Sequence, residues 1–143
     1  MNEAELVLFE TERFTASQAR GYRLPGYVLV ESKADVRALD AFADDARDEL
    51  ARCLADAERI VRALTDPERV YTLRFGEVQP RVHFHVVPRT ARVGAAFTAA
   101  TGDEPPFDGA KLVSWLWGAH AELGFTDDEL RAFVAAARGL HAG

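Results

Sequence analysis

The chain has 143 residues, of which 48% are hydrophobic and 28% are charged, so it can fold as one domain with a core and does not resemble a disordered chain. Its 23 acidic and 17 basic residues give a net charge of −6, which argues against binding of nucleic acid through bulk charge. The single cysteine, Cys53, can form no intrachain disulfide, so we expect a reducing, cytoplasmic environment. No secretory signal or long apolar run is present, so we expect no membrane partner.

The first half of the chain predicts three strands followed by one long helix. Strands are expected at 5–10, 13–17 and 27–31, and a loop rich in breakers is expected at 19–26. A helix is expected from about 40 to 64, because apolar residues recur there at steps of three and four. The residues of this apolar stripe are Phe42, Ala46, Leu50, Leu54, Ala57, Val61 and Leu64. Because a residue before proline disfavours the helical conformation, the pair Asp66-Pro67 should end the helix.

The second half predicts two further strands and two helices. Alternating residues predict strands at 70–75 and 81–87, and an irregular segment is expected at 90–109. Helices are expected at 110–123 and from Thr126 to about 140, the second opened by a capping box. The residues expected to face the core from the last helix are Leu130, Phe133, Val134 and Ala137. The predicted fold class is therefore α+β: one domain over 1–143 with a mostly antiparallel sheet, one long helix and a C-terminal helical extension at about 110–141.

The same patterns lead to expectations for one cysteine, two tryptophans and two histidines. Cys53 lies in the long helix beside Leu54 and is expected to be a small buried residue rather than a nucleophile. Trp115 and Trp117 are candidates for a substrate or dimer surface, but Trp115 fits the helical stripe, which favours core packing. His120 is expected on the surface, as is His141.

The segment 80–89 contains the candidate functional residues of the chain. Because side chains alternate along a strand, Arg81, His83 and His85 should share one face, while Val82 and its apolar neighbours take the other. Two imidazoles about 7 Å apart, preceded by a guanidinium, make a plausible anion site on a rigid element.

Two other interpretations of this face are open. It can be a polar outer surface of the sheet, or His83 and His85 can be two ligands of a metal. A metal site needs a third ligand, and no acidic residue follows His85 before Asp103. Arg89 stands where a cupin-like metal motif would have glutamate, so we expect no metal and no other cofactor.

The motif resembles the end of the signature of the histidine triad (HIT) family, in which histidines alternate with apolar residues before a Pro-Arg pair. The matching segment is His83-Phe84-His85-Val86-Val87-Pro88-Arg89. Upstream, 25–30 (Pro-Gly-Tyr-Val-Leu-Val) is similar to the family's Pro-Gly-His-x-Leu-Val strand, and the pair 35–36, the long helix and a strand ending at 74–76 follow in order. The resemblance covers about 6–89 and implies a HIT-like fold, a nucleotide substrate and a homodimer.

In that family the middle histidine attacks the α-phosphorus of a nucleoside phosphate derivative, and water then releases the nucleoside monophosphate. The resemblance assigns this nucleophile to His83, and assigns to His85 a hydrogen bond to the phosphate or the leaving oxygen. It implies hydrolysis or nucleotidyl transfer, as on dinucleoside polyphosphates such as diadenosine tetraphosphate, or on phosphoramidates. A neutral imidazole is a good nucleophile, and the reference pKa of histidine, about 6.5, leaves much of it neutral at pH 7.

The chain also departs from the family's pattern. Arg81 replaces the first histidine of the triad; arginine can grip phosphate but cannot shuttle a proton, while its backbone carbonyl remains available to orient His83. Glu77 stands where the family has a neutral donor and would repel a polyphosphate, although a small gap would instead place Gln79 there. Tyr27 and Asp35 stand where histidines are frequent. For the ribose, only Ser17 or Gln18 lies near the expected place.

These departures leave two functions of the same fold. The first is a nucleotide hydrolase or nucleotidyltransferase that uses His83. The second is a nucleotide-binding regulatory protein in which Arg81 has weakened turnover. For an enzyme, loss of a proton carrier at Arg81 favours phosphoanhydrides slightly over phosphoramidates.

Overall fold

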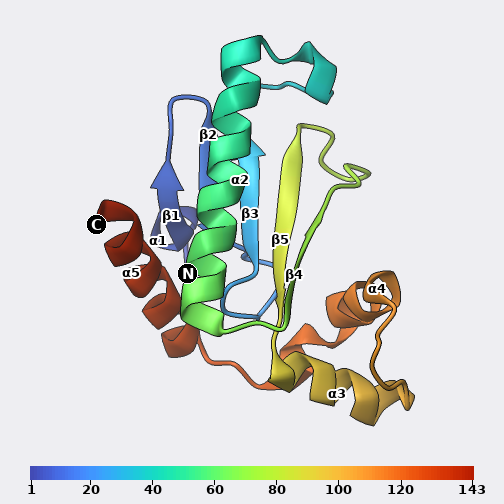
Figure 1. Ribbon diagram of the computed structural model, residues 1–143. Helices are drawn as coiled ribbons and strands as arrows, with labels where there is room; N and C mark the ends of the chain where they lie inside the picture. The colour runs from blue at the N-terminus through green and yellow to red at the C-terminus, as the bar shows by residue number, and fades with distance from the viewer.

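The computed structural model describes residues 1–143 and contains one five-stranded sheet in the order β1-β2-β3-β5-β4 (Figure 1). Every neighbouring pair of strands is antiparallel. The strands are β1 (Val7–Glu10), β2 (Phe14–Gln18), β3 (Val28–Ser32), β4 (Arg69–Leu73) and β5 (His83–Arg89). The predicted α+β class with an antiparallel sheet is confirmed.

Five helices surround the sheet. They are α1 (Glu3–Leu6), α2 (Asp44–Thr65), α3 (Ala91–Thr101), α4 (Gly109–Ala119) and α5 (Asp127–Ala142), with 3₁₀ turns at Leu39–Ala41 and His120–Leu123. Figure 1 shows α2 lying across one face of the sheet with α5 beside it, while α3 and α4 gather near the ends of β4 and β5. None of these helices combines the length and apolar character needed to cross a membrane.

The two faces of the sheet belong to two separate cores. Phe14, Val30 and Val86 point to the face that packs against α2 and α5. On the opposite face, Leu29 and Val87 join a smaller cluster with α3 and α4. The candidate site residues His83 and His85 lie on this second face, in register with residues of β3 and β4.

Several predicted boundaries are confirmed. The helix α2 ends at Thr65, and Asp66 takes a left-handed conformation with φ of 47° before Pro67. The capping box of α5 is present, because Thr126 accepts from the amide of Glu129 and the Glu129 side chain accepts from the amide of Thr126. All four residues expected to face the core from this helix are buried, as is Cys53.

Other expectations were wrong. The segment 90–109 is not irregular throughout, because Thr90 caps α3 and the helix buries Val93, Gly94 and Phe97. The start of the first expected strand is helical, since Asn2 caps α1. The predicted helix at 110–123 changes to a 3₁₀ turn at His120. Leu64 lies at the margin of the α2 stripe and is 36% exposed, while Ile60 is fully buried in the core.

Candidate functional site

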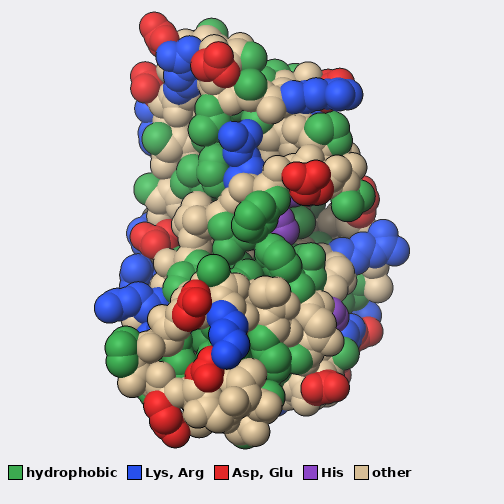
Figure 2. Space-filling model, turned by 90° about the vertical axis from the view of Figure 1, so that its right-hand side faces the viewer, with side chains coloured by type: hydrophobic (Ala, Val, Ile, Leu, Met, Phe, Trp, Pro, Cys, Tyr) green, Lys and Arg blue, Asp and Glu red, His purple; other side chains and the backbone are tan.

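β5 positions the two histidines as its alternation predicts. Val82, Phe84 and Val86 belong to the core under α2. His83 and His85 lie on the other face, where each has a neighbour in register: His83 pairs with Glu31, and His85 lies between Leu29 and Leu73. Figure 2 shows this side of the molecule, with a histidine side chain partly covered by hydrophobic side chains near the middle of the view.

The ring of His83 is oriented by the backbone. Its Nδ1 lies 2.8 Å from the carbonyl oxygen of Arg81, which confirms the contact expected from the sequence. A carbonyl oxygen can only accept a hydrogen bond, so Nδ1 carries the proton and Nε2 holds the free lone pair. This tautomer is the one that a histidine nucleophile requires.

His85 lies in a more enclosed aromatic environment. Its Nδ1 is 2.6 Å from the hydroxyl of Tyr27, and the indole Nε1 of Trp117 donates to the same hydroxyl at 2.9 Å. The rings of Tyr22 and His83 lie nearby, with centroid distances to His85 of 6.2 and 5.3 Å. Burial, together with the neighbouring His83, lowers the pKa of His85 to about 4, so this ring is neutral at pH 7.

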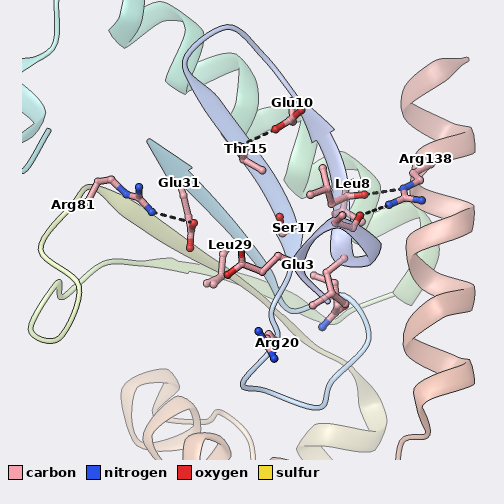
Figure 3. A pocket seen from close by; sticks show the side chains of 14 residues that line it. Glu3, Leu8, Glu10, Thr15, Ser17, Arg20, Leu29, Glu31, Arg81 and Arg138 are labelled. Carbon is pink, nitrogen blue, oxygen red and sulfur yellow. Dashed lines mark hydrogen bonds and ion pairs between the residues drawn. The ribbon is translucent and has the colours of Figure 1, made fainter. Parts of the chain in front are cut away.

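Arg81 precedes β5 and forms an ion pair with Glu31. Its Nη2 lies 3.7 Å from the carboxylate, and its Nε is buried without a hydrogen-bond partner. Figure 3 shows that the two side chains reach toward each other across the end of the sheet. The pair places one cation and one anion beside His83, because Glu31 is the cross-strand neighbour of that histidine.

A groove of about 780 Å³ extends from Arg81 across β3 and β2 to α1 and α5 (Figure 3). Thr15, Ser17 and Leu29 form its floor, and Arg20 and Arg138 line its sides. Ser17 is in register with Leu29, which is itself in register with His85, so Ser17 lies two strands away from this histidine. At a strand spacing of about 4.8 Å, this distance is roughly 10 Å.

Four other candidate residues from the sequence analysis do not line this groove with a free side chain. Gln79 accepts from the amide of Arg81 at 3.2 Å and is exposed, and Glu77 lies exposed in the same loop. Gln18 does not offer its side chain to a ligand: it is 1% exposed, and its carboxamide is bonded to the backbone of Leu24 and Gly26. The Asp35 carboxylate pairs with Arg37, which lowers the pKa of that carboxyl.

The remaining histidines lie apart from this site. His120 is half-buried, contrary to the surface position expected, and its Nδ1 accepts from the amide of Arg23 at 3.0 Å. His141 stacks on Phe9 with ring centroids 4.3 Å apart. No three side chains of His, Cys, Asp or Glu are grouped so that they could hold a metal ion.

No family model matches the sequence, and no curated protein matches it either. Several solved structures, however, match the structure of this chain. A histidine triad protein from Bradyrhizobium japonicum superposes with a TM-score of 0.64 at 15% identity, over 94% of this chain and 88% of that one. The chain has the histidine triad fold. A Hit-like protein involved in cell-cycle regulation from Bartonella henselae matches with a TM-score of 0.61 at 14% identity, over 97% of this chain and 87% of that one.

The chain also matches part of a longer protein. The NitFhit protein of C. elegans matches 96% of this chain with a TM-score of 0.62 at 17% identity, but the match spans only 27% of that protein. At these identities the likeness shows the fold.

Trp117, a candidate for a substrate or dimer surface, lies beside His85, where its indole contacts Tyr27, a contact that the sequence did not predict. One contributor to the site was missed from the sequence. Glu31 was assigned to a strand but to no role. Its position follows from strand register, which pairs β3 with β5 across a gap of more than 50 residues in the chain.

Proposed function

We propose that this protein is a hydrolase or nucleotidyltransferase that acts on the α-phosphate of a nucleoside phosphate derivative through a nucleotidyl-His83 intermediate. The observation that supports this most directly is the His83 ring, whose Nδ1 is held by the Arg81 carbonyl so that Nε2 is the nucleophilic nitrogen. The adjoining groove offers space for the nucleoside part of the substrate.

The residues around His83 bind the phosphate, the leaving group and the ribose. Arg81 binds the non-bridging phosphate oxygens and stabilises the charge that develops during attack, because its guanidinium is permanently charged. His85 donates a hydrogen bond to the phosphate or the leaving oxygen. Ser17 is the candidate for the ribose hydroxyls, since it lies on the groove floor and is not enclosed like Gln18. Gln79 and Glu77 lie exposed in the loop between β4 and β5, outside the lining of the groove.

A nucleotide-binding regulatory protein is the second candidate. The ion pair between Arg81 and Glu31 favours it, because a phosphate must compete with the carboxylate for the guanidinium. The two candidates differ in turnover and not in binding.

A panel of nucleotides distinguishes them. Adenosine and guanosine nucleotides, dinucleoside polyphosphates and phosphoramidates are incubated with the protein with and without excess chelator, and release of nucleoside monophosphate is measured. A dinucleoside polyphosphate hydrolase that uses His83 releases the monophosphate under both conditions. Binding of the panel without turnover supports the regulatory protein, and loss with chelator followed by rescue with zinc supports a metal hydrolase.

We also propose a homodimer, as the resemblance implies. β4 is an edge strand, and an apolar groove of about 590 Å³ separates it from α4. The groove is lined by Tyr71, Leu73 and Val113 among others, and a second copy would remove these side chains from water. The mass of the protein in solution tests this.

Replacing Arg81 by alanine is expected to weaken binding of a nucleoside monophosphate roughly 10- to 100-fold, because a charge-assisted hydrogen bond contributes about 1.5–3 kcal/mol. The loss also leaves Glu31 without its partner, which adds repulsion of the phosphate. Calorimetric titration measures the effect. Arg59→Ala is the matched control, since this arginine lies on α2 across the sheet and has only a 3.9 Å contact with Asp56. Equal affinity in wild type and Arg81→Ala would show that Arg81 does not contact the phosphate.

A further inference from the structure

The hydroxyl of Tyr27 lies within hydrogen-bond distance of two side chains from distant parts of the chain, His85 and Trp117. Tyr27 precedes β3 and is 0% exposed, and its ring stacks on Tyr22 with centroids 4.6 Å apart. Its oxygen lies 2.6 Å from Nδ1 of His85 and 2.9 Å from Nε1 of Trp117. The tyrosine is therefore held in place by packing, and its hydroxyl has two specific partners.

The chemistry of these partners fixes where the protons are. An indole N–H can only donate, so the oxygen of Tyr27 accepts from Trp117. The single hydroxyl hydrogen then has Nδ1 of His85 as its acceptor. The reverse arrangement, with Nδ1 donating to Tyr27, would leave the hydroxyl hydrogen buried and unpaired. His85 consequently accepts at Nδ1 and carries its ring proton on Nε2.

The surroundings also keep this ring uncharged. Besides Leu29 and Leu73, which are in register with it, the side chains around His85 are Tyr27 and Tyr22 from the segment before β3, His83 from its own strand, and Trp117 from α4. None of them is a carboxylate that would stabilise an imidazolium. Burial lowers the pKa of His85 to about 4, and burial raises that of Tyr27.

We infer that Tyr27 is a positioning residue that fixes His85 as a neutral Nε2–H hydrogen-bond donor, and that the site transfers nucleotidyl groups from leaving groups that depart without a proton. This inference rests on the proposed function. It assigns the substrate to the phosphoanhydride class, in preference to amine-linked phosphoramidates.

The bonds that form and break explain the preference for a phosphoanhydride. The lone pair of His83 Nε2 forms a bond to the α-phosphorus while the bond to the leaving oxygen breaks, and its electron pair leaves with that oxygen. A departing phosphate is stable as an anion and needs only the hydrogen bond from His85. Water then attacks the phosphorus, the bond to His83 breaks, and the water proton passes to solvent.

An amine must instead receive a proton in order to leave. If His85 gave up its Nε2 proton, it would have to take one from Tyr27, and burial makes this phenol a weaker acid. Arg81 stands beside His83 but does not release a proton at physiological pH. The chain's residues at the site thus supply charge stabilisation without general acid catalysis.

The tautomer is tested by NMR of protein that carries ¹⁵N-labelled histidine, with the His85 signals assigned from their loss in His85→Gln. In the wild type at pH 7 we expect a protonated Nε2 and an unprotonated Nδ1. Tyr27→Phe removes the hydroxyl and should populate the second tautomer. Trp117→Phe provides a second variant with the same expectation, because Tyr27 is then free to accept from Nδ1. Thr101→Val is the control, since its hydroxyl is bonded to the carbonyl of Phe97 on α3 and not to His85.

The substrate class is tested with one nucleoside 5′-phosphate joined either to pyrophosphate or to a primary alkylamine. We expect kcat/KM for the anhydride to exceed that for the amine by about 100-fold or more, the usual contribution of a missing general acid. Thr101→Val should keep this ratio, and Tyr27→His should reduce it because an imidazole can pass a proton to His85. Equal rates in the wild type, or a proton on Nδ1 of His85, would overturn the inference. The expected tautomer without turnover of either substrate would support the assignment of Tyr27 and refute the proposed function.

Discussion

Replacing His83 by alanine is expected to lower release of nucleoside monophosphate by on the order of 10⁴-fold or more, because the nucleophile of a covalent mechanism has no substitute. Affinity for the monophosphate should change little, since Arg81 and the groove remain. Initial rates and calorimetric titration measure the two effects separately. Such a separation distinguishes a lost nucleophile from a damaged binding site.

His141→Ala is the matched control for this substitution. His141 lies at the end of α5, where it stacks on Phe9, and it is exposed. Its loss should leave the rate within a factor of a few of the wild type. A His83→Ala protein that is folded by circular dichroism and retains a rate close to the wild type would mean that His83 is not the nucleophile.

Replacing Val82 by aspartate, one residue away from His83, is expected to unfold the protein. Val82 is 1% exposed in the core beneath α2, and its amide and carbonyl bond to the backbone at Val36 and Ser32. The change removes roughly 1.5–3 kcal/mol of apolar burial and adds an unpaired buried charge that costs several kcal/mol more. Their sum is comparable with the whole stability of a small domain, about 5–15 kcal/mol.

Val78→Asp makes the same chemical change at a position that is 99% exposed. Its free energy of unfolding should stay within about 0.5 kcal/mol of the wild type. Urea denaturation followed by circular dichroism compares the variants. If Val82→Asp unfolds at the same urea concentration as Val78→Asp, then Val82 does not face the core and the strand faces are assigned wrongly.

The sequence predicted those parts of the fold in which a local pattern and the tertiary environment agree. β5 has a core on one face and a half-open surface on the other, so its period of two is visible in the residue types. The ends of α2 and α5 depend on neighbouring residues only, at Asp66-Pro67 and at the capping box of Thr126. In contrast, α3 was not predicted, because its segment is rich in glycine, threonine and alanine and only Val93 and Phe97 are large apolar residues at helical spacing.

The site was predicted where it lies on a single strand and missed where it depends on distant contacts. The orientation of His83 involves a residue two positions away, so it followed from the sequence. The environment of His85 joins Tyr27 to Trp117, which lies 90 residues later in the chain. Gln18 was a ribose candidate by residue type, but the loop from Leu24 to Gly26 folds back over it and uses its carboxamide. No local pattern specifies these contacts, because they form only when the C-terminal helices and the loop pack on the sheet.

The central claim is a covalent nucleotidyl intermediate on His83, and mass spectrometry of the trapped protein tests it most directly. The protein is mixed with a dinucleoside polyphosphate, quenched in alkaline denaturant within the first turnover, and digested with a protease. We predict that the peptide containing His83 gains the mass of one nucleoside monophosphoryl group, and that His83→Ala shows no such gain. Turnover with an unmodified His83 peptide, or with the nucleotidyl group on another residue, would contradict the account.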